Sequence, residues 1–319
     1  MHRKRTRFAA RVNRVALALE RRGVVATYEL HDRALSNQAS RRRFARHRPE
    51  LDQVQRRIVD ALDAEGYATV TFQELFADDG LRLEIDGQAA RFAGETDAAL
   101  AREGSGESDT ELRRRVGKEF VVRLHSYGVE LGLDDPWFRA CASSRLLDIA
   151  NSYLRMWSKL EYVDVWYSVP QPESAERRSS QRWHRDYNDR HLLKAFLYLV
   201  DVDEETGPFE YVPGSVGSGP YAGAWPWRPL GETYPEQEEL ARCVPPDAVR
   251  TFTAPKGTMI FCNTSGFHRG GFATHKPRIL ATVTYCSPAS LASLTERSYT
   301  FVPAGELERL AAPARYALT

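Results

Sequence analysis

Residues 192–215 read LLKAFLYLVDVDEETGPFEYVPGS, and this stretch decides the fold. Its first part is apolar apart from Lys194, as a short buried strand should be. EETGP and PGS then supply Gly and Pro, the residues of tight turns. Short β runs and turns of this kind alternate from Glu161 onward, a pattern typical of a sandwich or jelly roll. We therefore predict a double-stranded β-helix core, cupin-like, over about residues 161–290.

Helical patterns dominate before this core. Residues 12–20 and 51–63 are amphipathic, and residues 134–142 begin with acids and a Pro, as first turns prefer. Residues 143–154 are amphipathic as well, whereas the Gly, Asp and Ser residues of 77–109 predict a hairpin and loop. The fold class is thus mainly β with α, in which an α-helical N-terminal layer covers the β-helix core.

The charge is divided unevenly along the chain. Residues 1–57 hold sixteen Lys or Arg against five Asp or Glu, although the whole chain has a net charge of only +1. A basic segment can bind nucleic acid, but this one has few aromatic residues to stack on bases. We predict a mostly helical N-terminal extension over 1–57, packed on the main domain at 58–319 or on a second subunit of a homodimer.

Composition argues against a membrane or secreted protein. The hydrophobic content is 42% and the mean hydropathy −0.48, and no apolar run approaches the ~20 residues that span a bilayer. The N-terminal apolar stretch is too short for a signal peptide. Four Cys residues without C-x-x-C spacing indicate reduced thiols. A cytoplasmic location is expected.

A candidate metal motif follows the first predicted strands. His184 and Asp186 stand two residues apart in QRWHRD, so on an extended segment both side chains leave the same face. A second imidazole, from His268 in GFHRGG, would complete a two-His, one-carboxylate set that leaves three octahedral positions open. A bare H-x-D pair is common by chance, so the motif depends on its surroundings.

Arg278 is the second element of the candidate site. It begins the apolar run RILATVTY, and a buried guanidinium needs a partner. Its planar fork suits a carboxylate held at two points. A structural salt bridge is the alternative, but the ten-residue offset from His268 favours an anionic co-substrate.

These motifs resemble the phytanoyl-CoA dioxygenase-like family of iron(II)- and 2-oxoglutarate-dependent oxygenases. The resemblance runs through WHRD, the strand at 192–202, the turn at 204–215, His268 and Arg278. It implies iron held by His184, Asp186 and His268, with the distal carboxylate of 2-oxoglutarate on Arg278. Many relatives carry a hydroxyl residue where this chain has Gly270, so one co-substrate contact must come from elsewhere.

Further site residues are predicted on the neighbouring strands and in the stretch after the PGS turn. Phe196 aligns with an aromatic that lines the co-substrate pocket in relatives, and Lys194 and Tyr167 are candidate neighbours on adjacent strands; ordinary core packing is the alternative for each. Aromatic residues in the Gly- and Pro-rich stretch after the PGS turn are candidate substrate walls, or rings that pin a loop to the core: Tyr221, Trp225, Trp227 and Tyr234.

The function expected from these residues is oxidation of an unactivated C–H bond in a small molecule, most simply hydroxylation, in specialised-metabolite biosynthesis. Iron(II), 2-oxoglutarate and O₂ are the implied cofactors and co-substrates. Desaturation, epimerisation, oxidative ring closure, and oxidation of a lipid or acyl thioester are alternatives within the class. A non-catalytic metal- or nucleic-acid-binding scaffold is the alternative outside it, and the intact four-residue set argues against it.

Overall fold

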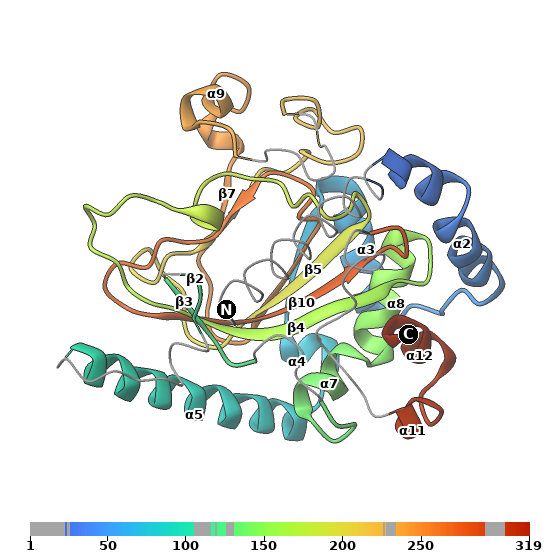
Figure 1. Ribbon diagram of the computed structural model, residues 1–319, viewed down its shortest axis with the longest axis horizontal. Coiled ribbons are helices and arrows are strands. Elements are labelled where there is room, and N and C mark those ends of the chain that lie inside the picture. The colour runs from blue at the N-terminus through green and yellow to red at the C-terminus, as the bar shows by residue number, and fades with distance from the viewer. Residues whose placement is uncertain are drawn as a thin grey trace, which may run out of the picture.

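The computed structural model describes residues 23, 26–104, 116–118, 120–125, 131–225, 227, 234–290 and 304–319. Two antiparallel sheets form its centre, and helices cover the larger one (Figure 1). In spatial order, the larger sheet consists of β1 (Tyr67–Thr71), β8 (Thr258–Cys262), β5 (Leu192–Tyr198), β10 (Arg278–Cys286), β4 (Lys159–Ser168), β3 (Val121–Arg123) and β2 (Val116–Lys118).

The smaller sheet faces the larger one and completes the predicted jelly roll. Its strands are β7 (Arg250–Phe252), β6 (Phe209–Tyr211) and β9 (His268–Arg269), in that spatial order. An antiparallel bridge between His184 and His268 extends it by one more segment. Strands from distant parts of the chain thus alternate between the two sheets, which confirms the double-stranded β-helix predicted for this region.

The two faces of the larger sheet bury different side chains. Its outer face packs against helices through Val163, Val165 and Leu197, within the largest apolar cluster. Its inner face turns Phe196 and Tyr198 toward the smaller sheet, where they pack with other aromatic side chains of both sheets. Because side chains alternate along a strand, strand register decides which residues enter the interior between the sheets.

Helices cover the outer face and one end of the sheet. Three of the predicted helices are confirmed: α3 (Gln53–Glu65) overlaps the range 51–63, and α7 (Pro136–Cys141) and α8 (Ser144–Leu154) lie inside the ranges 134–142 and 143–154. Asp52 caps α3 in a capping box with Gln55, and Asp135 caps α7 ahead of Pro136. The helices are α2 (Ser36–Arg46), α3 (Gln53–Glu65), α4 (Phe72–Phe76), α5 (Asp79–Gly104), α7 (Pro136–Cys141), α8 (Ser144–Leu154), α9 (Gln237–Ala241), α11 (Ala304–Leu307) and α12 (Ala312–Leu318).

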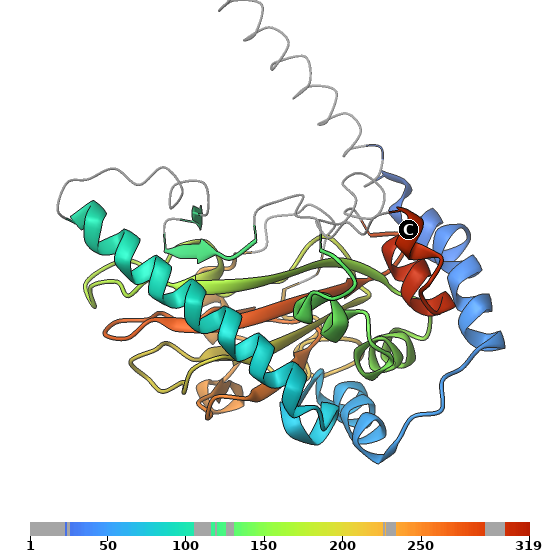
Figure 2. The same cartoon turned by 90° about the horizontal axis from the view of Figure 1, so that it is seen from below.

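The prediction of hairpin and loop over 77–109 is wrong. Most of this range forms α5, a 26-residue helix that lies across the outer face of the larger sheet (Figure 2). Its glycines misled the prediction, but its buried apolar residues recur at helical spacings of four, four, three and seven positions: Leu81, Ile85, Ala89, Phe92 and Ala99. Burial of this stripe outweighs the cost of roughly 1 kcal/mol for each helical glycine.

The N-terminal region packs on the β core in its described part. Tyr28 donates a hydrogen bond to the buried Asp189, and Asn37 accepts one from the backbone of Ala289. The predicted boundary at residue 57 falls inside α3, and the helix predicted at 12–20 lies outside the described residues. Among the described helices, none combines the length and apolar character that crossing a bilayer requires.

Candidate metal and co-substrate site

The three predicted metal ligands meet at one place in the interior. His184 and His268 lie on adjacent segments that exchange two backbone hydrogen bonds, at 2.9 and 3.0 Å. Their imidazole Nε2 atoms lie 4.0 and 3.9 Å from the two carboxylate oxygens of Asp186. The three donor atoms all lie within 4.8 Å of one another, which suits an ion about 2.0–2.2 Å from each donor.

Backbone carbonyl groups set the tautomer of both imidazoles. Nδ1 of His184 lies 2.8 Å from the Arg182 oxygen, and Nδ1 of His268 lies 3.0 Å from the Gly266 oxygen. Since a carbonyl oxygen only accepts, each Nδ1 carries the proton and donates it. Nε2 then presents its lone pair on the Asp186 side, which is the usual arrangement of a metal-binding His.

The PGS turn holds both ligand-bearing segments. Arg185, between the two ligands of the H-x-D motif, points away from them and donates to the carbonyl oxygen of Ser215 at 2.7 Å. The Ser215 hydroxyl accepts from the backbone N–H of Phe267, next to His268, at 2.8 Å. A Cβ at Gly266 would lie 2.7 Å from this hydroxyl, so the approach requires glycine. One turn thereby fixes the spacing of all three ligands.

Asp186 is an ionised carboxylate in a cationic setting. Lys194 lies on the inner face of β5, and its Nζ is 2.6 Å from Oδ2 of Asp186. Burial alone would raise the pKa of the Asp186 carboxyl, but attraction to the Lys194 ammonium group opposes burial, and this pKa lies below its ordinary value. The carboxylate is therefore available as a ligand at neutral pH.

Arg278 is a buried cation with no carboxylate beside it in the described part of the chain. Its Nη1 donates to the Gly207 oxygen at 2.5 Å and its Nη2 to the Ser168 hydroxyl at 3.4 Å. Its Nε finds no acceptor among the described residues, and only 5% of the residue is exposed. Burial lowers the pKa of the guanidinium, yet Arg stays charged. Such a group is suited to an anion.

The three candidate neighbours divide between the two faces of the sheet. Phe196 lies on the inner face, 5.0 Å from the Phe209 ring, which in turn is 5.9 Å from the His268 ring. Lys194 also lies on the inner face, where it contacts the Asp186 carboxylate. Tyr167 points to the outer face, where its hydroxyl donates to Asp97 of α5. The structure therefore does not bring Tyr167 to the site, and its alternative reading as a core residue fits.

The four aromatic residues after the PGS turn fall into two groups, those that contact the candidate ligands and those that pack in an apolar cluster. Tyr234 stacks on the His184 ring at 5.4 Å, and the indole N–H of Trp227 donates to the backbone oxygen of Asp186 at 2.7 Å. Tyr221 and Trp225 instead pack against an apolar cluster around Trp183. Two of the four candidates thus lie at the metal ligands.

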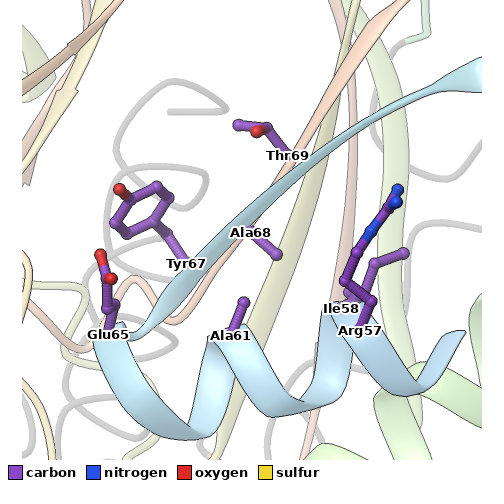
Figure 3. Close-up of a pocket in the computed structure, with 7 residues that line it drawn as sticks. All are labelled: Arg57, Ile58, Ala61, Glu65, Tyr67, Ala68 and Thr69. Carbon is purple, nitrogen blue, oxygen red and sulfur yellow. The ribbon is translucent and has the colours of Figure 1, made fainter. Parts of the chain in front are cut away.

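A separate hollow of about 190 Å³ lies between α3 and β1, at the edge of the larger sheet (Figure 3). None of the predicted site residues lines it. Arg57 and Glu65 stand near its two ends, and Ile58, Ala61 and Ala68 form much of its wall. The hollow is therefore distinct from the candidate metal site.

Sequence reasoning missed two polar residues beside the metal ligands. Glu161 is the bulge residue where β4 shifts register against β10, and its two carboxylate oxygens accept from the Asn188 amide at 3.0 and 2.8 Å. Burial raises the pKa of the Glu161 carboxyl to about 7, with Lys194 opposing the rise. The H-x-D-x-N spacing was the available signal, because residues two apart on an extended segment leave the same face.

The chain belongs to the phytanoyl-CoA dioxygenase (PhyH) family, whose sequence profile matches residues 59–279. It is accordingly a 2-oxoglutarate-dependent oxygenase, an iron enzyme, and the donor set of two imidazoles and one carboxylate fits iron(II). No individually curated protein matches the chain at a significant level.

Solved structures with a similar shape are distant in sequence. The α-ketoglutarate-dependent epimerase SnoN from nogalamycin biosynthesis is 20% identical, over 76% of this chain and 86% of its own, with a TM-score of 0.45. EctD from S. alaskensis, with 2-oxoglutarate and 5-hydroxyectoine, is 17% identical over 81% and 91%, with a TM-score of 0.48. HygX from Streptomyces hygroscopicus, with nickel and 2-oxoglutarate bound, is 16% identical over 75% and 88%, with a TM-score of 0.44.

Proposed function

We propose that this oxygenase oxidises an unactivated C–H bond of a small molecule, with hydroxylation as the outcome, in specialised-metabolite biosynthesis. His184, Asp186 and His268 hold iron(II), and Arg278 holds the distal carboxylate of 2-oxoglutarate. When bound, the metal supplies the activation of O₂, coupled to decarboxylation of 2-oxoglutarate to succinate. The protein contributes position, charge and the exclusion of water.

The observation that carries this proposal is the buried guanidinium of Arg278. A structural salt bridge would give this cation a carboxylate partner, and the described residues provide none within 4.0 Å. The side chain lies on the same inner face as Lys194 and Phe196, because the β10–β5 register pairs Leu280 with Tyr198 and Thr284 with Lys194. An anion on Arg278 would therefore extend along this face toward the metal ligands.

The surroundings favour a substrate with an apolar or aromatic surface. Tyr234 keeps 38% of its surface exposed although its ring stacks on that of His184. Tyr187, which follows Asp186 in the sequence, keeps 45% exposed. Partly exposed aromatic rings near the candidate ligands are suited to contact with a partly apolar small molecule. Epimerisation, desaturation and ring closure begin from the same hydrogen abstraction, and oxidation of an acyl thioester remains the alternative substrate class.

The proposal is tested by 2-oxoglutarate binding to the Mn(II)-loaded protein in the absence of O₂, measured by calorimetry. One site per chain is expected, and Arg278→Gln should weaken it while Mn(II) affinity stays unchanged. Arg250→Gln is the matched control, because Arg250 is an exposed arginine of β7 that pairs with Tyr67. Equal 2-oxoglutarate affinity in all three proteins would contradict the assignment of Arg278.

A further inference from the structure

Lys194 is an unusual neighbour for a metal ligand. It is a lysine in an otherwise apolar strand, paired in register with Thr284 of β10 and Cys262 of β8, and its side chain is only 12% exposed. A cation beside a metal ion opposes metal binding by like-charge repulsion. Metal affinity therefore gives no reason for a lysine at this position.

The contacts of Lys194 fix its ammonium group from two sides. Nζ lies 2.6 Å from Oδ2 of Asp186 and 6.0 Å from the centre of the Tyr162 ring. The Glu161 carboxyl also attracts it, and Glu161 is held by Asn188, two residues after the metal ligand. These polar contacts therefore connect Lys194 to two residues of one segment, to Asp186 directly and to Asn188 through Glu161. A buried ammonium in such a network has a defined position.

The proposed reaction requires three open coordination positions on the metal, and the placement of Lys194 can help to keep them open. The keto-acid end of 2-oxoglutarate needs two coordination positions and the oxidant needs one, so three of six must stay open. A carboxylate can bind a metal through both oxygens, as in many calcium sites, and would then occupy one position too many. Two imidazoles and a carboxylate leave three positions only when the carboxylate binds through a single oxygen.

We propose that Lys194 is a positioning residue that occupies Oδ2 of Asp186 and so restricts this ligand to metal binding through Oδ1. The proposal rests on the proposed function of the His184, Asp186 and His268 site. Oδ1 lies 4.0 Å from Nε2 of His184 and Oδ2 lies 3.9 Å from Nε2 of His268, but only Oδ2 is paired with the lysine, at 2.6 Å. In this role Lys194 lowers the affinity for the metal but keeps one coordination position open.

The test counts the exchangeable water molecules on Mn(II) by water-proton relaxation. The wild-type protein should hold about three, since three protein ligands leave three octahedral positions. Lys194→Met should hold about two, because both Asp186 oxygens become free to bind. It should also bind Mn(II) roughly three- to ten-fold more tightly through loss of a nearby cation, and bind 2-oxoglutarate more weakly. Lys194→Arg, which keeps a cationic donor, should restore three waters.

If Lys194 had only a structural role, the results for Lys194→Met would differ. Lys194→Met would then keep the wild-type water count or bind Mn(II) more weakly, and either result overturns the proposal. Lys256→Met is the control, since Lys256 pairs with Asp86 at 3.2 Å on the surface. Lys194→Leu provides a second neutral variant should Lys194→Met not fold. Failure of the wild-type protein to bind Mn(II) would refute the metal site itself, whereas normal binding with an unchanged count refutes only the role of Lys194.

Discussion

Replacement of Arg278 by Gln distinguishes a clamp for 2-oxoglutarate from a structural element of the core. A charge-assisted contact to a carboxylate is worth about 1.5–3 kcal/mol. A loss of about 2 kcal/mol raises the Kd for 2-oxoglutarate roughly 30-fold. At a concentration about 100 times the wild-type Kd, the stabilisation by 2-oxoglutarate then falls from about 2.7 to about 0.9 kcal/mol.

The ligand-free protein should respond differently. The variant loses hydrogen bonds to the Gly207 oxygen and the Ser168 hydroxyl, but it also removes a buried cation that has no carboxylate partner among the described residues. These effects oppose each other, so the unfolding midpoint without 2-oxoglutarate should move by only a few degrees. Thermal unfolding of the Mn(II)-loaded protein, with and without 2-oxoglutarate, measures both quantities. A large loss of stability without ligand, together with unchanged stabilisation by 2-oxoglutarate, would refute the reasoning.

Three further predictions concern other residues. His268→Ala should lose metal binding by equilibrium dialysis while keeping the circular dichroism of the fold, and retained stoichiometric binding would remove His268 from the ligand set. Tyr167→Phe should lower the free energy of unfolding by about 1 kcal/mol through the lost contact with Asp97, and a change in 2-oxoglutarate affinity would place Tyr167 at the site after all. Burial raises the pKa of the Glu161 carboxyl from 4.5 to about 7, so protonation of this group favours the folded state, and the stability that it contributes should be lost as the pH rises through that window. Urea unfolding of Glu161→Gln should show a flatter pH dependence than that of the wild-type protein, and equal slopes would contradict the shift.

The sequence predicted that His184, Asp186 and His268 lie together, and the structure brings their donor atoms within 4.8 Å of one another. His184 and Asp186 share a face by strand alternation, and the PGS turn marks the fold that brings His268 beside them. The structure adds the reason for the turn: Ser215 contacts both ligand-bearing segments. A motif of turn residues therefore carried information about a site that is distant in sequence.

The errors arose where tertiary packing outweighs local preference. Glycines in α5 suggested a loop, although the helical spacing of its apolar residues was visible in the sequence. Tyr167 lies two and four positions after Val165 and Val163, so all three side chains leave the same face of β4. The two valines mark this face as the one that helices cover. Strand alternation could therefore have predicted where Tyr167 lies. The contact between Lys194 and Asp186 could not, because it depends on the packing of β5 against a loop segment.

The most direct test of the central claim combines iron(II) and 2-oxoglutarate with the protein. We expect one iron(II) per chain, bound in the absence of O₂, and a visible absorption band that appears only when 2-oxoglutarate is added to the iron-loaded protein. Admission of O₂ should then convert 2-oxoglutarate to succinate, and His268→Ala should show neither the band nor the product. A wild-type protein that binds no iron, or a His268→Ala variant that forms succinate at the wild-type rate, would contradict the account.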